Sequence, residues 1–194
     1  MSSGPAPHLA FGLARLAALA RQESWRAGEE HGLTPTQADI LDLLARRTAG
    51  LRLGQLAELL HITQPTTSDA VAALVRKKLV RRLADPSDGR VTLLRATAGG
   101  LRLAERWPES FAAVVEAMSA EDRASMLAIV MRTIAGLVEA GTITPQRMCL
   151  SCRFFAPDTH PGSSKPHHCG YLDTPLGAGD LRTDCPEFQE LDAA

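Results

Sequence analysis

Apolar side chains recur every three or four positions along most of the first two thirds of the chain, which is the period of a helix with one apolar face. The first such run covers residues 8–31 and stops before Gly32, a residue that suits the left-handed turn after a helix. A second helix is predicted to begin after Thr34, because a capping threonine, a following proline and a glutamine three residues later form a strong start signal. Two further helices are predicted over residues 53–61 and 64–79.

Two short runs with β-forming residues follow, over residues 80–83 and 91–94. Residues 84–90 between them contain Pro, Gly, Ser and Asp, which favour tight turns, so the three segments together predict a β-hairpin. Helices followed by a hairpin in this order are the pattern of a winged helix-turn-helix, whose core we place at residues 34–96. The predicted fold is therefore mainly α with a small β-wing.

Two more helices are predicted beyond the hairpin, over residues 97–118 and 119–140. Both have broad apolar faces, wider than one small domain can cover by itself. We therefore expect a helical dimerisation region and a homodimer, and we predict that residues 1–140 form one domain that includes this region.

Charge is distributed unevenly along the chain. The net charge is only -1, which argues against a protein that coats nucleic acid along its whole surface. Residues 64–95, however, hold seven Lys or Arg against three Asp, whereas residues 148–194 hold three basic and seven acidic residues. The two regions are therefore expected to have different roles. A content of 45% hydrophobic and 22% charged residues excludes a fully disordered or collagen-like chain.

The segment VRKKLV at residues 75–80, followed by DPSDGR at residues 85–90, resembles the recognition helix and wing of the MarR family of bacterial transcription regulators. The resemblance covers residues 8–140. It implies a homodimer whose recognition helices enter successive major grooves of a pseudo-palindromic operator in double-stranded DNA. It also implies a small-molecule effector between the dimerisation helices and the winged domain. One departure is Lys78, where MarR-like chains often have glycine.

Ten residues are candidates for the DNA-binding surface. Short polar side chains at a helix N-terminus can approach base edges, and the resemblance gives this role to Gln64, Thr66, Thr67 and Ser68. The resemblance also puts Arg90 at the wing tip, against phosphate or the minor groove, where Asp88 can brace it through a charge-assisted hydrogen bond. Contacts to the sugar–phosphate backbone are expected from Arg76, Lys77, Arg81 and Arg82. Each residue alone could be an ordinary solvated side chain, so the prediction rests on the whole set.

No apolar run approaches the ~20 residues needed to cross a bilayer, so no membrane partner is expected. We predict a cytoplasmic protein, in which thiols stay reduced. The sequence lacks a Gly-rich phosphate loop or another recognisable nucleotide motif, and the chain is not predicted to be an enzyme.

All four cysteines lie in the last quarter of the chain, where Pro and Gly are frequent and apolar periodicity is absent. Cys149 and Cys152 form a CxxC pair, 16 residues separate this pair from Cys169, and 15 more precede Cys185. Thiolates are soft donors for Zn²⁺ and for iron–sulfur clusters, and metal ligation can supply folding energy that a small core lacks. We therefore predict a loop-rich metal-binding module at residues 148–194, after a linker at residues 141–147.

The cofactor is predicted to be a 4Fe-4S cluster or Zn²⁺, and the sequence leaves this choice open. The stretch around the four cysteines is similar to the cluster-binding stretch of high-potential iron–sulfur proteins, although its final spacing is longer. His160, His167 and His168 are alternative zinc ligands.

Three functions follow from these alternatives. The first is a regulator whose DNA binding responds to the redox or metal state of the module. The second is a regulator with a purely structural zinc site and a small-molecule effector. The third, from a different class, is a thiol or iron–sulfur redox protein.

Overall fold

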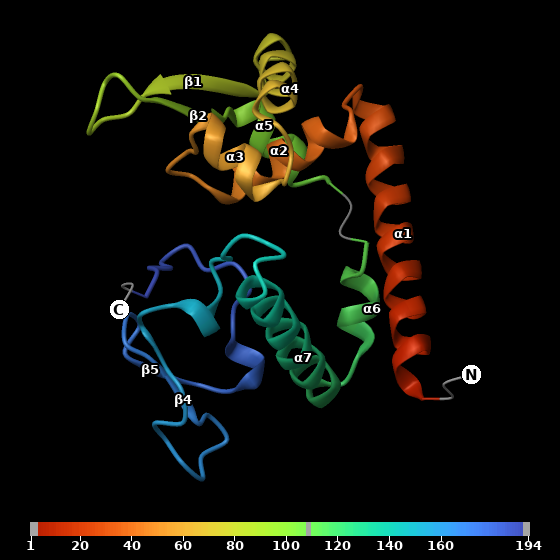
Figure 1. Cartoon of the computed structure of the whole chain (residues 1–194), viewed down its shortest axis with the longest axis vertical. Helices are drawn as coiled ribbons and strands as arrows, with labels where there is room; N and C mark the ends of the chain where they lie inside the picture. The colour runs from red at the N-terminus through yellow and green to blue at the C-terminus, as the bar shows by residue number, and fades with distance from the viewer. Residues whose placement is uncertain (1–3, 108–109, 192–194) are drawn as a thin grey trace. The chain divides into compact units, whose positions relative to one another are not determined.

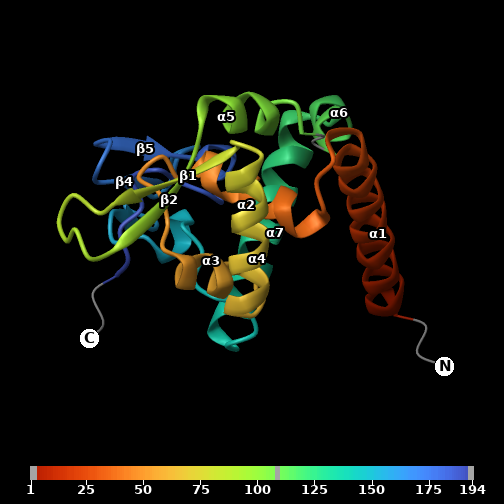
Figure 2. The same ribbon diagram turned by 90° about the horizontal axis from the view of Figure 1, so that it is seen from above.

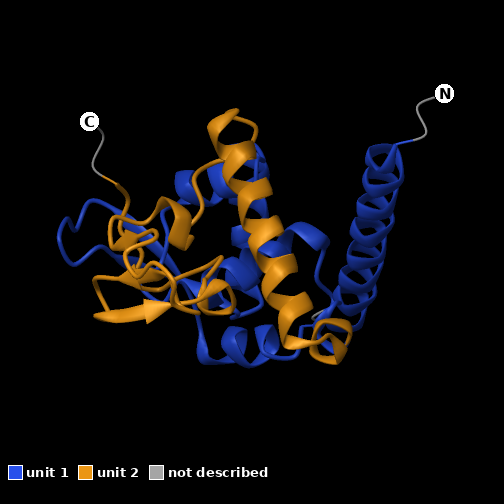
Figure 3. Ribbon diagram, turned by 90° about the horizontal axis from the view of Figure 1, so that it is seen from below, with its two compact units in different colours: residues 1–113 blue, residues 114–194 orange. Residues whose placement is uncertain are grey.

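The computed structural model describes residues 4–107 and 110–191. It divides the chain into two compact units, residues 1–113 and 114–194 (Figure 3). Unit 1 contains α1 (Pro5–His31), α2 (Pro35–Arg46), α3 (Leu53–Leu59), α4 (Gln64–Arg76), β1 (Val80–Ala84), β2 (Thr92–Ala96) and α5 (Ala98–Ala104) (Figure 1). The predicted mainly helical fold with a small β-wing is confirmed.

The helix starts follow the capping signals in the sequence. The Thr34 side chain accepts a hydrogen bond from the backbone N–H of Gln37 at 3.3 Å and so caps α2. Thr63 caps α4 in the same way, from the N–H of Thr66 at 3.4 Å. Such bonds satisfy backbone donors that have no partner inside the helix, and this is why the starts are set locally.

The core of unit 1 lies where α2, α3 and α4 meet, and Figure 2 shows these helices beside one another. Leu41 and Leu44 from α2, Leu56 from α3, and Val71 and Leu74 from α4 are almost completely buried. Burying each such side chain contributes roughly 1.5–3 kcal/mol of favourable transfer free energy. The core therefore fixes the orientation of α4 within unit 1.

The C-terminal end of α4 turns through Lys78, which has a φ of 59°. This left-handed conformation favours glycine, because a side chain crowds the neighbouring carbonyl. The N–H of Leu79 closes the turn by donating to the carbonyl of Leu74 at 3.0 Å. The departure from glycine noted in the sequence thus falls on the one residue of this turn with positive φ.

Strands β1 and β2 form an antiparallel hairpin whose register pairs Val80 with Ala96 and Ala84 with Thr92. Leu94 of β2 also forms an antiparallel bridge with Leu51, which lies two residues before α3. Leu94 is buried, so the hairpin is anchored at its base in the core of unit 1. Its loop extends away from that base (Figure 1).

The prediction of one continuous helix over residues 97–118 is wrong. The structure has α5 followed by turns at residues 105–107, and a separate short helix α6 (Ala112–Ala117) that crosses the boundary between the units. Pro108 disfavours one helix that runs through this point, because proline has no N–H to donate and disfavours helical backbone in the residue before it. Residues 108 and 109 themselves lie outside the described residues.

Unit 2 is built on α7 (Ala120–Glu139), which confirms the helix predicted over residues 119–140. The other elements are short: the 3-10 helices η1 (Cys149–Ser151) and η2 (Ala178–Asp180), and the strands β3 (Phe155–Ala156), β4 (His167–Cys169) and β5 (Thr174–Leu176). The three strands form one antiparallel sheet in the order β3-β4-β5.

Helix α7 shares a hydrophobic core with the cysteine-containing segment. Met131 is completely buried in one cluster with Met148, Cys149, Leu176 and Leu181. The structure therefore groups α7 with the cysteines, whereas the sequence predicts a linker at residues 141–147 between them. The physical reason is that α7 supplies the apolar surface that the short strands lack. No helix among the described residues is long and apolar enough to cross a membrane.

Candidate DNA-binding surface and cysteine cavity

The first turn of α4 presents short polar side chains. Gln64 and Thr66 are exposed and Ser68 is half-buried. The Thr66 hydroxyl lies 2.9 Å from that of the capping residue Thr63, which holds it at the helix end. The backbone N–H groups of a helix N-terminus also attract anions such as phosphate. This surface can therefore offer both hydrogen-bonding groups and a favourable electrostatic field to DNA.

Thr67 is not part of that surface, and its predicted exposure is wrong. Its side chain is 0% exposed, and its hydroxyl donates to the carbonyl of Thr63 at 2.9 Å. The residue after Thr66 on a helix points about 100° around the axis, which here turns Thr67 into the core of unit 1. Thr67 therefore stabilises the first turn of α4 from the core of unit 1.

Lys77 and its neighbours differ in their surroundings. The Lys77 ammonium donates to the carbonyl of Gly32 and, at 2.8 Å, to Oε1 of Gln37. These two hydrogen bonds use two of the three ammonium donors and link the end of α4 to Gly32 and to the first turn of α2. Arg76, Lys77 and Lys78 are all exposed. Lys77 therefore makes an internal contact in this structure, and its phosphate contact stays a prediction.

The wing carries exposed cations on a braced loop. Arg81 and Arg82 are exposed on β1. At the loop, Asp88 lies 3.4 Å from Nε of Arg90 and also accepts the Arg90 N–H at 3.1 Å. Arg90 itself has a side chain that is 94% exposed, so its guanidinium is free to meet a phosphate or a groove.

Asp85 organises the start of the same loop. Its carboxylate accepts both the N–H and the hydroxyl of Ser87, at 2.9 and 2.6 Å. These hydrogen bonds, together with Arg52 at 3.5 Å, lower the pKa of Asp85 below its ordinary value. Sequence reasoning missed Arg52, because only the fold brings the residue before α3 next to the wing.

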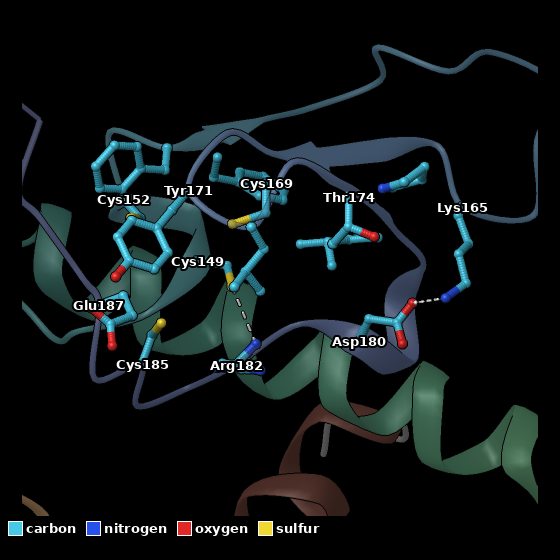
Figure 4. Close-up of a pocket in the computed structure, with 15 residues that line it drawn as sticks. Cys149, Cys152, Lys165, Cys169, Tyr171, Thr174, Asp180, Arg182, Cys185 and Glu187 are labelled. Carbon is cyan, nitrogen blue, oxygen red and sulfur yellow. Dashed lines mark hydrogen bonds and ion pairs between the residues drawn. The ribbon is translucent and has the colours of Figure 1, made fainter.

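The four cysteines line one cavity of about 220 Å³ in unit 2. Cys149 and Cys152 flank the turn of η1, Cys169 ends β4, and Cys185 follows η2. Figure 4 shows the labelled sulfurs of Cys149, Cys169 and Cys185 directed toward the same space. The remaining lining is mixed. It includes the apolar and aromatic residues Phe154, Phe155, Tyr171, Leu172, Pro175 and Leu176 and the charged residues Lys165, Asp180, Arg182 and Glu187.

The cavity extends beyond the four cysteines, because Lys165, Thr174 and Asp180 also line it. Among residues 4–107 and 110–191, no group of three or more His, Cys, Asp or Glu side chains is arranged to hold a single metal ion. The three histidines proposed as alternative ligands do not line the cavity. His160 Nε2 lies 3.2 Å from His168 Nδ1, and His167 lies beside Asp158.

The Cys149 thiol is, with that of Cys152, one of the two that are buried. Burial raises the pKa of Cys149 above the usual value for cysteine. The backbone N–H of Arg182 donates to its sulfur at 3.2 Å, a contact that favours the thiolate (Figure 4). A metal cation bound here would add a stronger stabilisation of the thiolate than this one hydrogen bond.

Residues 31–91 match the model of the MarR family. Of solved structures, S. aureus MepR in its DNA-binding conformation is 25% identical with a TM-score of 0.57, and the match covers 66% of this chain and 98% of that one. The S. aureus MepR–DNA complex is 26% identical with a TM-score of 0.54, and covers 66% and 97%. The fold of unit 1 is that of the MarR winged helix. MarR proteins are transcription regulators rather than enzymes, in agreement with the prediction from the sequence.

CouR from Rhodococcus jostii RHA1, bound to p-coumaroyl-CoA, has the same MarR fold at 23% identity, with a TM-score of 0.55 over 71% of this chain and 95% of that one. No curated protein matches the sequence. The four cysteines all lie outside the residues that match the MarR model.

Proposed function

We propose that this protein is a homodimeric transcription regulator that binds a pseudo-palindromic operator in double-stranded DNA. The observation that carries the proposal is the exposed polar N-terminus of α4 in a MarR winged helix whose wing ends in the exposed Arg90. The similarity of the fold to MepR in its complex with DNA supports it. A helix of this kind fits the major groove, and a wing fits the adjacent backbone or minor groove.

The exposed residues divide into two groups by the contact that each can make. Gln64, Thr66 and Ser68 are the candidates for base edges, because their short polar side chains lie at the end of α4. Arg76, Arg81, Arg82 and Arg90 are the candidates for phosphate, because they are exposed cations on α4 and the wing.

The apolar surface of α1 supports the homodimer. Its exposed apolar residues include Leu9, Phe11, Leu13, Leu16 and Leu19. Leu9, Leu13, Leu16 and Leu19 are spaced three or four residues apart and so follow one face of the helix. An exposed apolar face of this kind is unfavourable in water and marks an interface. A two-fold dimer would present two copies of α4, as a pseudo-palindromic site requires. A small-molecule effector remains a prediction from the family resemblance alone.

The test is selection of duplexes from a random DNA pool, followed by titration of the selected site at several salt concentrations. Arg90→Ala is expected to weaken binding across sequences and to reduce the slope of log K against log salt by about 1, since one phosphate contact is lost. Arg123→Ala is the matched control, because it removes an exposed arginine on α7 of unit 2. Failure to select any duplex, or an equal effect of both variants, would contradict the proposal.

We also propose that Cys149, Cys152, Cys169 and Cys185 bind a metal centre, an iron–sulfur cluster or Zn²⁺, whose occupancy modulates DNA binding. The shared cavity of the four thiols supports this proposal. Operator affinity of the Cys149→Ser variant, compared with that of the metal-loaded and metal-free parent, is the test. Equal affinity in all three would leave a structural zinc site, or a thiol or iron–sulfur redox function, as the alternative.

A further inference from the structure

We infer that the cysteine cavity binds a four-iron, four-sulfur cluster rather than a zinc ion. We also infer that the bound cluster stabilises α7 through its buried residue Met131. The inference rests on the proposed metal centre and names both its cofactor and its mode of regulation. It does not depend on DNA binding.

The spacing of the thiols is the first argument. A zinc ion holds four sulfurs at about 2.3 Å from one point, so the sulfurs of a zinc site lie within about 4 Å of one another. In the described part of unit 2 no three potential ligands are arranged in this way. Instead the four cysteines are among the fifteen residues that line a cavity of about 220 Å³, which has room for a body larger than one ion. Each cysteine of a 4Fe-4S site binds a different iron, so its four thiolates stand around a larger body.

The walls of the cavity are the second argument. Phe154, Phe155 and Leu176 line it, and they would keep water from a buried cluster. The Arg182 N–H at 3.2 Å from Cys149 Sγ is the kind of hydrogen bond that stabilises and tunes cluster sulfurs. The soft donors that line the cavity are the four thiols. The carboxylates of Asp180 and Glu187 also line it, and Asp180 is paired with Lys165 at 3.0 Å. On ligation each thiol binds as thiolate and releases its proton to water.

The route to α7 follows from the shared core. Cys149 and Leu176 line the cavity and also belong to the cluster of buried residues that encloses Met131. Met131 is 0% exposed, although most of α7 is accessible. A filled cavity fixes η1 and β5, and these in turn fix the pocket that holds Met131. When the cavity is empty, Cys149 and Leu176 lack packing contacts on the side that faces it. The core around Met131 is then less stable, and α7 opens more readily.

The experiment uses the full chain, purified without oxygen from cells supplied with iron or with zinc. We expect four irons and four inorganic sulfides per chain, with broad visible absorption. Amide hydrogen exchange around Met131 in α7 should be at least about tenfold slower in the loaded protein than after removal of the metal with a chelator. One tightly bound Zn²⁺ per chain from both cultures, without sulfide, would overturn the cluster assignment.

Variants of two methionines on the same helix test the transmission. Met131→Ala should keep four irons per chain and lose the cluster-dependent slowing of exchange in α7. Met126→Ala is the control, because Met126 is 41% exposed on the same helix, and it should keep both. If Met131→Ala fails to fold, Met131→Leu conserves volume and should retain both iron and slowing. Full slowing in Met131→Ala, or none in the loaded parent protein, would overturn the role of Met131.

Discussion

Side chains of one type, next to each other in the sequence, have different roles in this protein. Thr66 is exposed at the end of α4, whereas Thr67 is buried and donates to the backbone. Arg76 is exposed, whereas the Lys77 ammonium is held by Gly32 and Gln37. Residue type and position in a motif are therefore insufficient to identify a DNA contact; the direction of the side chain decides.

Lys77 should act on DNA binding by positioning α4 and not by contacting phosphate. Lys77→Met is expected to weaken operator binding with an unchanged salt slope, because the loss is in the orientation of α4 and no counterion release is removed. It should also reduce the free energy of unfolding by about 1–3 kcal/mol, since acceptors at the α1–α2 turn lose a charged donor. Binding titrations at several salt concentrations and urea unfolding measure both. A slope reduced by about 1, as expected for Arg90→Ala, would show a phosphate contact instead.

The wing is an element held by local hydrogen bonds rather than by a core of its own. Its two strands pair over five residues each, and its loop is braced by Asp85 and Asp88. The start of the loop depends on the ionised Asp85 carboxylate, because the protonated form is a weaker acceptor of the Ser87 hydrogen bonds.

The wing loop should therefore be stable at neutral pH and loosen in acid. The pKa of Asp85 is lowered in the folded protein, mainly by its hydrogen bonds from Ser87. The resulting stability is fully present above the unfolded pKa of about 3.9 and is lost as the pH falls through the lower folded value. An NMR titration of the Ser87 amide should show its midpoint below that of a free aspartate. In Ser87→Ala the Asp85 midpoint should move up, and an unchanged midpoint would contradict the assignment.

The whole molecule consists of two compact units with separate hydrophobic cores. The core of unit 1 includes Leu56, and the core of unit 2 includes Met131. Metal binding to the cysteines, as proposed above, would add stability by mass action to the unit that holds them. The chain is therefore unsuited to description by a single two-state transition.

Calorimetry should resolve this difference between the units. Loading the cysteine site is expected to raise the transition temperature of unit 2 and leave that of unit 1 unchanged. Leu56→Ala should do the opposite. It should lower the transition temperature of unit 1, because a cavity in the core reduces the free energy of unfolding by about 2–5 kcal/mol, and it should leave the transition temperature of unit 2 unchanged. A single transition that shifts in both experiments would contradict independent stability.

The sequence by itself determined the parts of this protein that depend on neighbouring residues. The caps at Thr34 and Thr63, the turn-rich wing loop and the apolar periodicity are local, so the winged helix and α7 could be predicted from them. The four cysteines could be grouped as candidate metal ligands from their number and from the scarcity of apolar residues around them.

Only the tertiary structure decided where side chains from distant segments meet. It turned Thr67 inward, held Lys77 at the α1–α2 turn, brought Arg52 to Asp85, and placed the four cysteines around one cavity with Met131 in the adjoining core. The physical reason is that such contacts join residues far apart along the chain, and their positions are set by the packing of whole elements. Local propensity and spacing carry no information about that packing.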